Sequence, residues 1–406
     1  MAQLNKRQAL FTQMGVWAVI CTCFSIPLST SVMDLCSALV ILFWLLSGKA
    51  LLLPRLVRHN PVVFLATGLF LFFIAGLTYS PATIRDSFAV LMKYRELILL
   101  PMVISLVMDD ETAVQKAENS FLAGAILLLI ISYGMAFSLI PSIKYGYSLL
   151  FHITHSFFMA LLSFWALQRV LDSTRFRSFW LLIFLAATIN LIFITPGRTG
   201  MLSYAILMLL ALMQRLPWKS RLAGCLFFCL LIPVGFFTSA NISSRVQQAL
   251  QDIIHYEQGV SRTSLGMRLD WWGNSLDLIG EKPLLGHGTG SFAIQQGKLI
   301  KGSKTKPSDN PHNEYLMIGV QLGIPGMALF IALMVSQWLC ARSFEPHRKF
   351  LIQGVVLTMA TGCLMNSFLF DSHQGHFFAF FSALFFSSSK PYHVFKSCSF
   401  SPTISR

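Results

Sequence analysis

The sequence predicts an all-α integral membrane protein with about 12 transmembrane helices and one large, partly helical loop on the outer side. The first observation is composition: 55% of the 406 residues are hydrophobic, and the mean hydropathy is +0.64. Charged residues make up 12%, about half of the roughly 25% typical of soluble domains. The second observation is that apolar runs long enough to cross a bilayer recur along the chain. Because these runs are continuous rather than alternating, they favour helices over barrel strands.

The apolar runs place the expected spans in order along the chain. They cover residues 14–26, 33–46, 61–77, 87–107, 121–140, 149–170, 179–195, 201–213, 222–237, 314–340, 351–370 and 377–386. The chain therefore divides into transmembrane helices 1–9 in residues 1–238, a loop domain in 239–312, helices 10–12 in 313–390 and a cytoplasmic tail in 391–406.

Basic residues indicate how the spans are oriented. The formal net charge is +14. If the N-terminus is cytoplasmic, the cytoplasmic segments hold 18 Lys and Arg residues, whereas the short outer loops hold only Arg85, Lys144 and Arg198. This asymmetry follows the positive-inside rule and predicts that both termini are cytoplasmic. Since topology explains the basic residues, we expect the lipid bilayer and no nucleic acid as a partner.

The long hydrophilic segment 239–312 is predicted to be outside and partly helical. Ser243 and Ser244 are candidate caps for a first helix. A second helix is predicted from one apolar stripe at spacings of four and three, formed by Leu265, Leu269, Trp272, Leu276 and Ile279. The stretch 295–310 is rich in Lys, Ser and Gly and is expected to be mobile.

Three residues on the outer side are candidates for chemistry. Arg198 lies in a tight turn between two spans, where the alternative is an interfacial arginine that reaches lipid headgroups. Arg268 lies beside the apolar stripe, and its alternative is a structural pair with Asp270. His312 stands where the loop enters a long span. The helix N-terminus there should favour neutral imidazole, with Glu314 opposing this effect, although a histidine at such a place is often only a cap.

Further polar residues near the same side are candidates for substrate binding. Lys93 and Arg95 lie inside an apolar run, where charges are costly, unless they pair with Glu96. His155 is at the outer end of another span, and Asp371 is in the last outer turn. Asn310 or Asn313 is expected to cap the span that begins near Glu314. Asn313 and Glu314 are also candidates for substrate binding.

No metal or other cofactor is predicted. His373 and His376 have a metal-like spacing, but no set of carboxylates or cysteines completes a site around them. The motif Gly286-His-Gly-Thr-Gly290 lacks the strand and helix that flank a nucleotide-binding loop.

The candidate residues fit one reaction. Arginine binds a diphosphate well because each guanidinium stays charged and donates two parallel hydrogen bonds. A neutral histidine can remove a proton from a hydroxyl group. An apolar bundle accommodates a lipid tail. The set therefore predicts transfer from a lipid-linked diphosphate donor, with arginine stabilising the leaving group and histidine activating the acceptor, and with no metal or nucleotide.

The motifs resemble those of the O-antigen ligase and polymerase superfamily of bacterial envelope enzymes. The matching pieces, in order, are Lys93-Tyr-Arg95, Gly197-Arg-Thr-Gly200, Gly266-Met-Arg268 with Trp271 and Trp272, residues 282–292, Pro311-His-Asn-Glu-Tyr315, and Gly323-Ile-Pro-Gly326. The resemblance implies about twelve transmembrane helices and a periplasmic loop domain. It also implies catalytic roles for Arg198, Arg268 and His312. Lys93, Arg95, His155, Asn313, Glu314 and Asp371 are then expected to bind substrate.

Within this superfamily the resemblance favours an O-antigen ligase of the bacterial inner membrane. Such an enzyme transfers glycan from undecaprenyl diphosphate to a sugar hydroxyl of lipid A–core on the periplasmic side. O-antigen polymerases and protein O-oligosaccharyltransferases share the motifs and stay open as alternatives. A transporter is the alternative from another class, since Lys93 and Arg95 are deep charges, but no internal repeat is visible.

Overall fold

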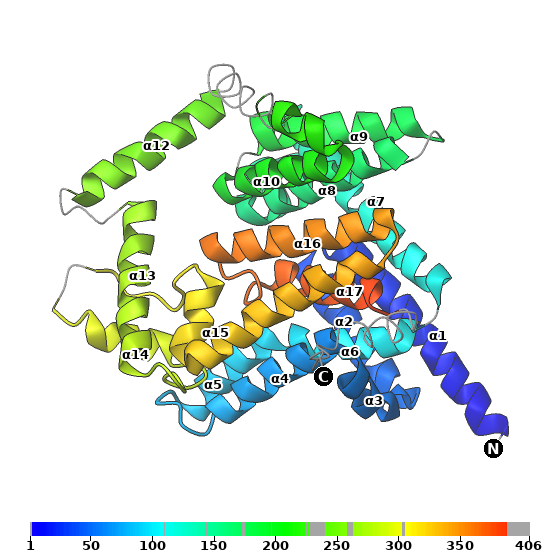
Figure 1. Cartoon of the computed structure of the whole chain (residues 1–406), viewed down its shortest axis with the longest axis horizontal. Coiled ribbons are helices and arrows are strands. Elements are labelled where there is room, and N and C mark those ends of the chain that lie inside the picture. The colour runs from blue at the N-terminus through cyan, green and yellow to red at the C-terminus, as the bar shows by residue number, and fades with distance from the viewer. Residues whose placement is uncertain are drawn as a thin grey trace, which may run out of the picture.

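The computed structural model describes residues 2–108, 110–142, 145–172, 175–195, 197–224, 226, 240–257, 263–302 and 305–387 (Figure 1). All of the secondary-structure elements assigned within these ranges are helices. The first half contains α1 (Ala2–Ser25), α2 (Thr30–Leu46), α3 (Leu53–His59), α4 (Pro61–Gly76), α5 (Ile84–Leu91), α6 (Glu96–Val107), α7 (Glu111–Ala136), α8 (His152–Asp172), α9 (Arg177–Ile189) and α10 (Arg198–Arg215). The second half contains α12 (Ala240–Glu257), α13 (Ser264–Glu281), α14 (Phe292–Leu299), α15 (Glu314–Cys340), α16 (Pro346–Met365) and α17 (Ser372–Phe385).

The helices pack into one bundle around a core of large aromatic side chains. Helix α1 packs on α2 and α7, α8 packs on α9 and α10, and α15 packs on α4 and α16. Phe121, Trp165, Phe377 and Phe381, from three different helices, pack in tilted and edge-to-face pairs with ring centroids 4.7–6.2 Å apart. Such aromatic pairs add specific geometry to the apolar burial and fix how α7, α8 and α17 meet.

Several described helices are long and apolar enough to cross a membrane. Four meet both criteria, and a fifth is formed if α2 and the segment Lys49–His59, bent by 81°, count as one span. Helices α4 and α6 are apolar but shorter. The chain is thus a helical membrane protein, while the count of about 12 spans stays a prediction. The expected span 222–237 and the tail 391–406 lie almost wholly outside the described residues.

The expected span 87–107 is not continuous. It is interrupted between α5 and α6 by a 3₁₀ turn, Met92–Tyr94, followed by Arg95. The interruption has a physical reason: a continuous apolar helix would leave Lys93 and Arg95 without polar partners, whereas here Arg95 donates to Asp34 at 2.6 Å. The fourth expected span is therefore a broken element with a polar centre.

The loop domain is more ordered than the sequence predicts. Helix α12 begins at Ala240, so Ser243 and Ser244 lie inside it and do not cap it. Helix α14 occupies part of the stretch expected to be mobile, because Gln296 is buried and accepts a hydrogen bond from the Ser308 amide at 3.0 Å.

The face of α13 that is buried coincides only in part with the predicted stripe. Trp271, Ser275, Leu278 and Ile279 are buried, whereas Leu276 of the stripe is exposed. The reason is that α13 packs against α15 along one side and runs across the ends of α15 and α16 (Figure 1). Within the predicted stripe, Ile279 is therefore buried in the bundle and Leu276 is not.

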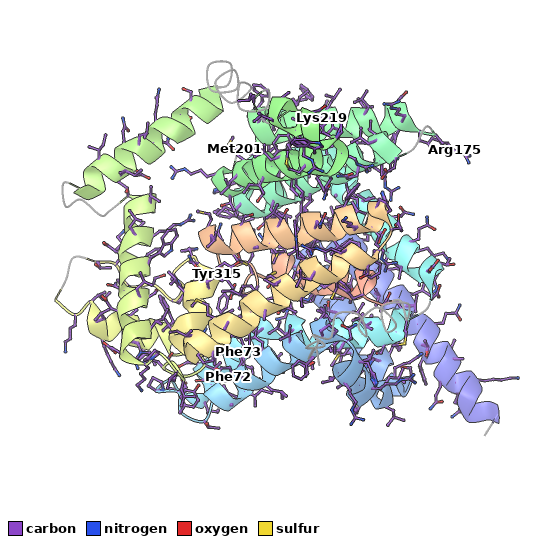
Figure 2. All side chains as sticks on the ribbon, viewed as in Figure 1. Phe72, Phe73, Arg175, Met201, Lys219 and Tyr315 are labelled. Atoms are coloured by element: carbon purple, nitrogen blue, oxygen red, sulfur yellow. The ribbon has the colours of Figure 1, made fainter. Side chains whose placement is uncertain are left out.

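The bundle has two distinct ends. In Figure 2, Tyr315 and Met201 lie toward the end that α13 covers, whereas Arg175 lies at the opposite end. The charge asymmetry predicts that the end with Arg175 is cytoplasmic and the end with α13 is outside.

Candidate functional site

A cavity of about 420 Å³ opens at the end of the bundle that α13 covers. Its walls come from five separate parts of the chain: the start of α2, Lys93, the start of α8, the approach to α15, and the turn between α16 and α17. The lining residues are Thr30, Lys93, Phe151, Ile153, Thr154, Asp309, Asn310, His312, Asn366, Phe370, Asp371, Ser372, His373 and Gln374. Each of these belongs to a segment that the charge asymmetry predicts at or near the outer side.

His312 lies on the wall of this cavity with a constrained backbone. Its φ is +53°, a left-handed conformation that is uncommon outside glycine and asparagine. The conformation is held from both sides, because the His312 amide donates to Asn310 Oδ1 at 2.7 Å and Asn313 Oδ1 caps α15 by accepting from the Leu316 amide at 3.1 Å. Unusual backbone geometry held by surrounding bonds is a feature of functional sites.

Two tryptophans of α13 hold the segment that carries His312. The Trp271 ring lies against the imidazole with centroids 5.5 Å apart. Trp272 donates from its indole nitrogen to the Pro311 carbonyl at 2.9 Å. The tryptophan pair noted in the sequence thus fixes both the backbone and the ring of this part of the site.

The environment of His312 favours the neutral imidazole. Burial lowers the pKa of His312 below its usual 6.5, the positive charge of Arg268 lowers it further, and Asp309 opposes both. The sequence correctly predicts the direction but not the cause, which is burial rather than the end of the helix. Glu314 does not oppose the shift as expected, because its carboxylate faces Tyr94 and the backbone of residues 369 and 370.

Arg268 comes from α13 and points toward the turn between α16 and α17. It donates from Nη2 to Asn366 Oδ1 at 3.3 Å. It does not pair with Asp270, whose carboxylate accepts a hydrogen bond from Thr305. Burial lowers the pKa of Arg268, and the positive charge of Arg198 lowers it further. Within the described part of the chain Arg268 forms no ion pair, so its charge is available for an anionic ligand.

Arg198 is the first residue of α10 and is partly exposed. Its guanidinium lies 3.6 Å from the carboxylate of Asp252 and 3.5 Å from the amide oxygen of Gln248, both on α12. The two arginines therefore approach the site from different helices and influence each other electrostatically.

Asn366 connects these parts and was missed by sequence reasoning. It lines the cavity and accepts from Arg268, and its Nδ2 donates to Thr199 Oγ1 at 2.9 Å. Thr199 follows Arg198 in α10, so one buried amide ties the α10 start to Arg268. In the sequence, Asn366 is visible only as a polar residue at the end of an apolar run. This feature alone does not distinguish a residue that ends a helix from one that belongs to a functional site.

Lys93 and Asp371 line another wall of the cavity. The Lys93 ammonium lies 5.7 Å from the centroid of the Phe370 ring. Burial raises the pKa of Asp371 to about 6, and the charge of Lys93 acts in the opposite direction. These two predicted residues are thus brought together with His312 around one cavity.

Arg198 and Arg268 do not line the cavity themselves, and neither do four other predicted residues. Arg95 is paired with Asp34. Asn313 serves as the α15 cap. His155 is fully buried between Ser148 and Asn190. Direct contact with substrate is therefore not indicated for these three.

Glu314 is the fourth and acts as a structural acceptor. It is fully buried, and its oxygens accept from the Tyr94 hydroxyl at 3.0 Å and from the Leu369 and Phe370 amides at 2.9 and 3.0 Å. These bonds tie the start of α15 to the turn between α16 and α17, which forms part of the cavity wall.

No three His, Cys, Asp or Glu side chains of the described residues are grouped so that they could hold a metal ion. The cavity lining combines the Lys93 ammonium, amide groups and the Asp309 and Asp371 carboxylates, a set of donors and acceptors that suits a polyhydroxyl ligand.

The fold and the site define a polytopic helical membrane protein with a polar, histidine-containing cavity at one end of its bundle. A family model described as O-antigen ligase matches residues 182–331, the segment that contains Arg198, Arg268 and His312. The match shows that this part of the chain is similar to the O-antigen ligase family. The chain is also 28% identical over 154 residues to an uncharacterized protein of Haemophilus influenzae. That alignment covers 36% of this chain and 39% of the relative.

Proposed function

We propose that the protein is an O-antigen ligase that transfers glycan from undecaprenyl diphosphate to a sugar hydroxyl of lipid A–core on the periplasmic face of the inner membrane. The observation that carries the proposal is the arrangement of His312 and Arg268. A histidine with a lowered pKa lines a cavity beside a guanidinium that forms no ion pair within the described residues. The family match over the same residues supports a reaction of this class.

The reaction uses a base on one side and cations on the other. Neutral His312 accepts the proton of the acceptor hydroxyl, and the acceptor oxygen forms the new bond to the anomeric carbon of the donor glycan. The bond from that carbon to the phosphate oxygen breaks, and undecaprenyl diphosphate leaves with the electron pair. Arg268 and Arg198 stabilise the charge on the leaving diphosphate, and His312 then releases its proton to water.

The remaining cavity wall suits a sugar. Lys93, Asp371 and Asn366 offer donors and acceptors for hydroxyl groups, and Phe151 and Phe370 offer aromatic surface. Pockets with a few convergent polar groups on an otherwise apolar lining are typical of ligand sites. We assign this wall to the glycan, and we assign the apolar bundle surface below it to the lipid tails.

Reconstitution tests the proposal and separates it from the alternatives. Purified protein in liposomes receives undecaprenyl-diphosphate-linked glycan together with lipid A–core, with a second lipid-linked glycan, or with an acceptor protein. Glycan transfer to lipid A–core alone is expected for a ligase. Elongated lipid-linked glycan would instead indicate a polymerase, and a glycosylated protein an oligosaccharyltransferase. Movement of donor across the bilayer without transfer would indicate a transporter.

Substitution tests the residues. His312→Ala and Arg268→Ala should abolish transfer while the protein still inserts and elutes as a single species in detergent. Arg169→Ala is a matched control, since Arg169 also donates to an asparagine oxygen but lies on α8 at the end predicted to be cytoplasmic. Normal transfer by both site variants would overturn the proposal.

A further inference from the structure

A fully buried hydrogen-bond network lies beneath the turn that presents Arg198. His155 of α8 contacts Asn190 Oδ1 through Nε2 at 2.8 Å and Ser148 Oγ through Nδ1 at 2.7 Å. Asn190 donates from Nδ2 to Ser132 at 2.9 Å, and its Oδ1 also accepts from Thr195 Oγ1 at 2.7 Å. These polar side chains are at most 6% exposed, so every bond in the network replaces one that water would otherwise provide.

The hydrogen-bond partners of His155 determine the protonation state of its imidazole ring. Asn190 Oδ1 can only accept, so His155 must donate from Nε2. The Ser148 hydroxyl oxygen already accepts from the Leu150 amide at 3.0 Å, which leaves its hydrogen free to bond Nδ1. Neutral imidazole with its proton on Nε2 therefore satisfies every group. The ring directs its one donor toward the oxygen that also binds Thr195.

The segment between Asn190 and Arg198 has an unusual backbone. Residues Asn190–Ile194 form a π-helix, and the Thr195 amide donates to the Asn190 carbonyl at 2.9 Å. Short π-helical turns occur frequently at functional sites because they redirect the residues that follow. Thr195 lies three residues before Arg198, and both its backbone and its side chain thus bind Asn190.

The same turn of α8 also seats the start of α10. A Cβ on Gly197 would lie 2.2 Å from Ser156 Oγ, and a Cβ on Gly200 would lie 2.3 Å from Ser156 Cβ. Both glycines are therefore needed for the close approach, and Ser156 is adjacent to His155 in the chain. The first turn of α8 contacts the Arg198 turn directly through Ser156 and indirectly through His155.

We propose that His155, acting through Asn190 and Thr195, is a positioning residue that sets where Arg198 meets the donor diphosphate. This inference rests on the proposed function, since it assumes that Arg198 binds that diphosphate. It assigns His155, which does not line the cavity, a role in the site that requires no contact with substrate. Loss of a supporting hydrogen bond of this kind lowers affinity or rate by about 10- to 100-fold.

Equilibrium binding of undecaprenyl diphosphate to the purified protein in nanodiscs tests this role without requiring turnover. His155→Leu is expected to weaken binding by about 10-fold or more. His155→Gln, which can still donate to Asn190, is expected to restore most of the affinity. Gln168→Leu is the matched control, because Gln168 is equally buried on α8 but bonds Gln214 and Arg215 at the opposite end.

A double-mutant cycle distinguishes positioning from general support of the fold. If His155 acts through Arg198, the Arg198→Ala and His155→Leu double variant should bind no more weakly than Arg198→Ala alone. Losses that multiply, or an equal loss in Gln168→Leu, would overturn the inference. Unchanged binding in His155→Leu while Arg198→Ala binds weakly would also overturn it. Unchanged binding in Arg198→Ala would instead contradict the role proposed for Arg198 itself.

Discussion

Arg268 reaches the cavity through Asn366, which lines it: the guanidinium donates to the amide oxygen of Asn366 at 3.3 Å. The two residues lie far apart in the sequence, on α13 and at the end of α16. Because the other end of the amide binds Thr199, Asn366 determines how Arg268 is placed relative to the start of α10. An arginine held by an amide keeps its full charge, whereas one held by a carboxylate would be neutralised.

This relationship predicts different kinetic effects for two substitutions of Asn366. Asn366→Ala removes the positioning bond and should lower the transfer rate by about 10-fold or more, since a hydrogen bond to a charged group contributes about 1.5–3 kcal/mol. Asn366→Asp should raise the donor KM, because the new carboxylate competes with the diphosphate for Arg268. Steady-state kinetics with varied donor measures both effects. Asn119→Asp is the matched control, since Asn119 accepts from Arg169 at the opposite end of the bundle.

The pH dependence of transfer should report the state of His312. As a base His312 is active only when neutral, so the rate should fall as the pH drops through its pKa, which burial and Arg268 place below 6.5. Asp309 raises this pKa, so Asp309→Asn should move the acidic limb of kcat/KM to lower pH. Asp277→Asn, on an exposed face of α13, should leave the limb in place. An acidic limb that does not move in Asp309→Asn would contradict the assignment of His312 as the base.

Hydropathy predicts the positions of the long helices well. The expected span 314–340 coincides with α15, and the expected spans 61–77 and 149–170 lie close to α4 and α8. Hydropathy succeeds there because the signal is local: one run of apolar residues forms one helix. It fails at residues 92–95, where the helix breaks so that charged side chains reach partners on another helix.

The partners within the site could not be predicted in the same way. Arg268 and Asp270 are two residues apart, and on a helix such residues point to different faces, so proximity in sequence gives the wrong partner. Asn366 and Asn190 are single polar residues near the ends of apolar runs. Their roles depend on which helices pack beside them, and one sequence does not contain that information. His312, Arg198 and Arg268 could be proposed from the sequence because they carry chemistry that an apolar bundle does not need.

Glu314 should be important for stability rather than for chemistry. Its oxygens accept from the Tyr94 hydroxyl and from two buried backbone amides. Glu314→Ala would leave the Leu369 and Phe370 amides without an acceptor, at a cost of about 1–3 kcal/mol for each. Thermal unfolding in detergent should therefore show a clear loss of stability. Glu314→Gln keeps one oxygen for the amides and should be tolerated, which would not be expected if a carboxylate had to contact substrate.

The carboxylate of Asp252 lies 3.6 Å from the guanidinium of Arg198 and forms an ion pair with it, so a donor diphosphate that binds Arg198 must compete with Asp252. The Arg198 side chain is 37% exposed, and exposed ion pairs contribute about 0.2–1 kcal/mol. Asp252→Asn should therefore lower the donor KM, by at most about fivefold, with little change in kcat. Kinetics at low and high salt provide the control, because screening should reduce the difference between wild type and variant. A higher donor KM in Asp252→Asn would show that Asp252 holds Arg198 in its binding position and does not block it.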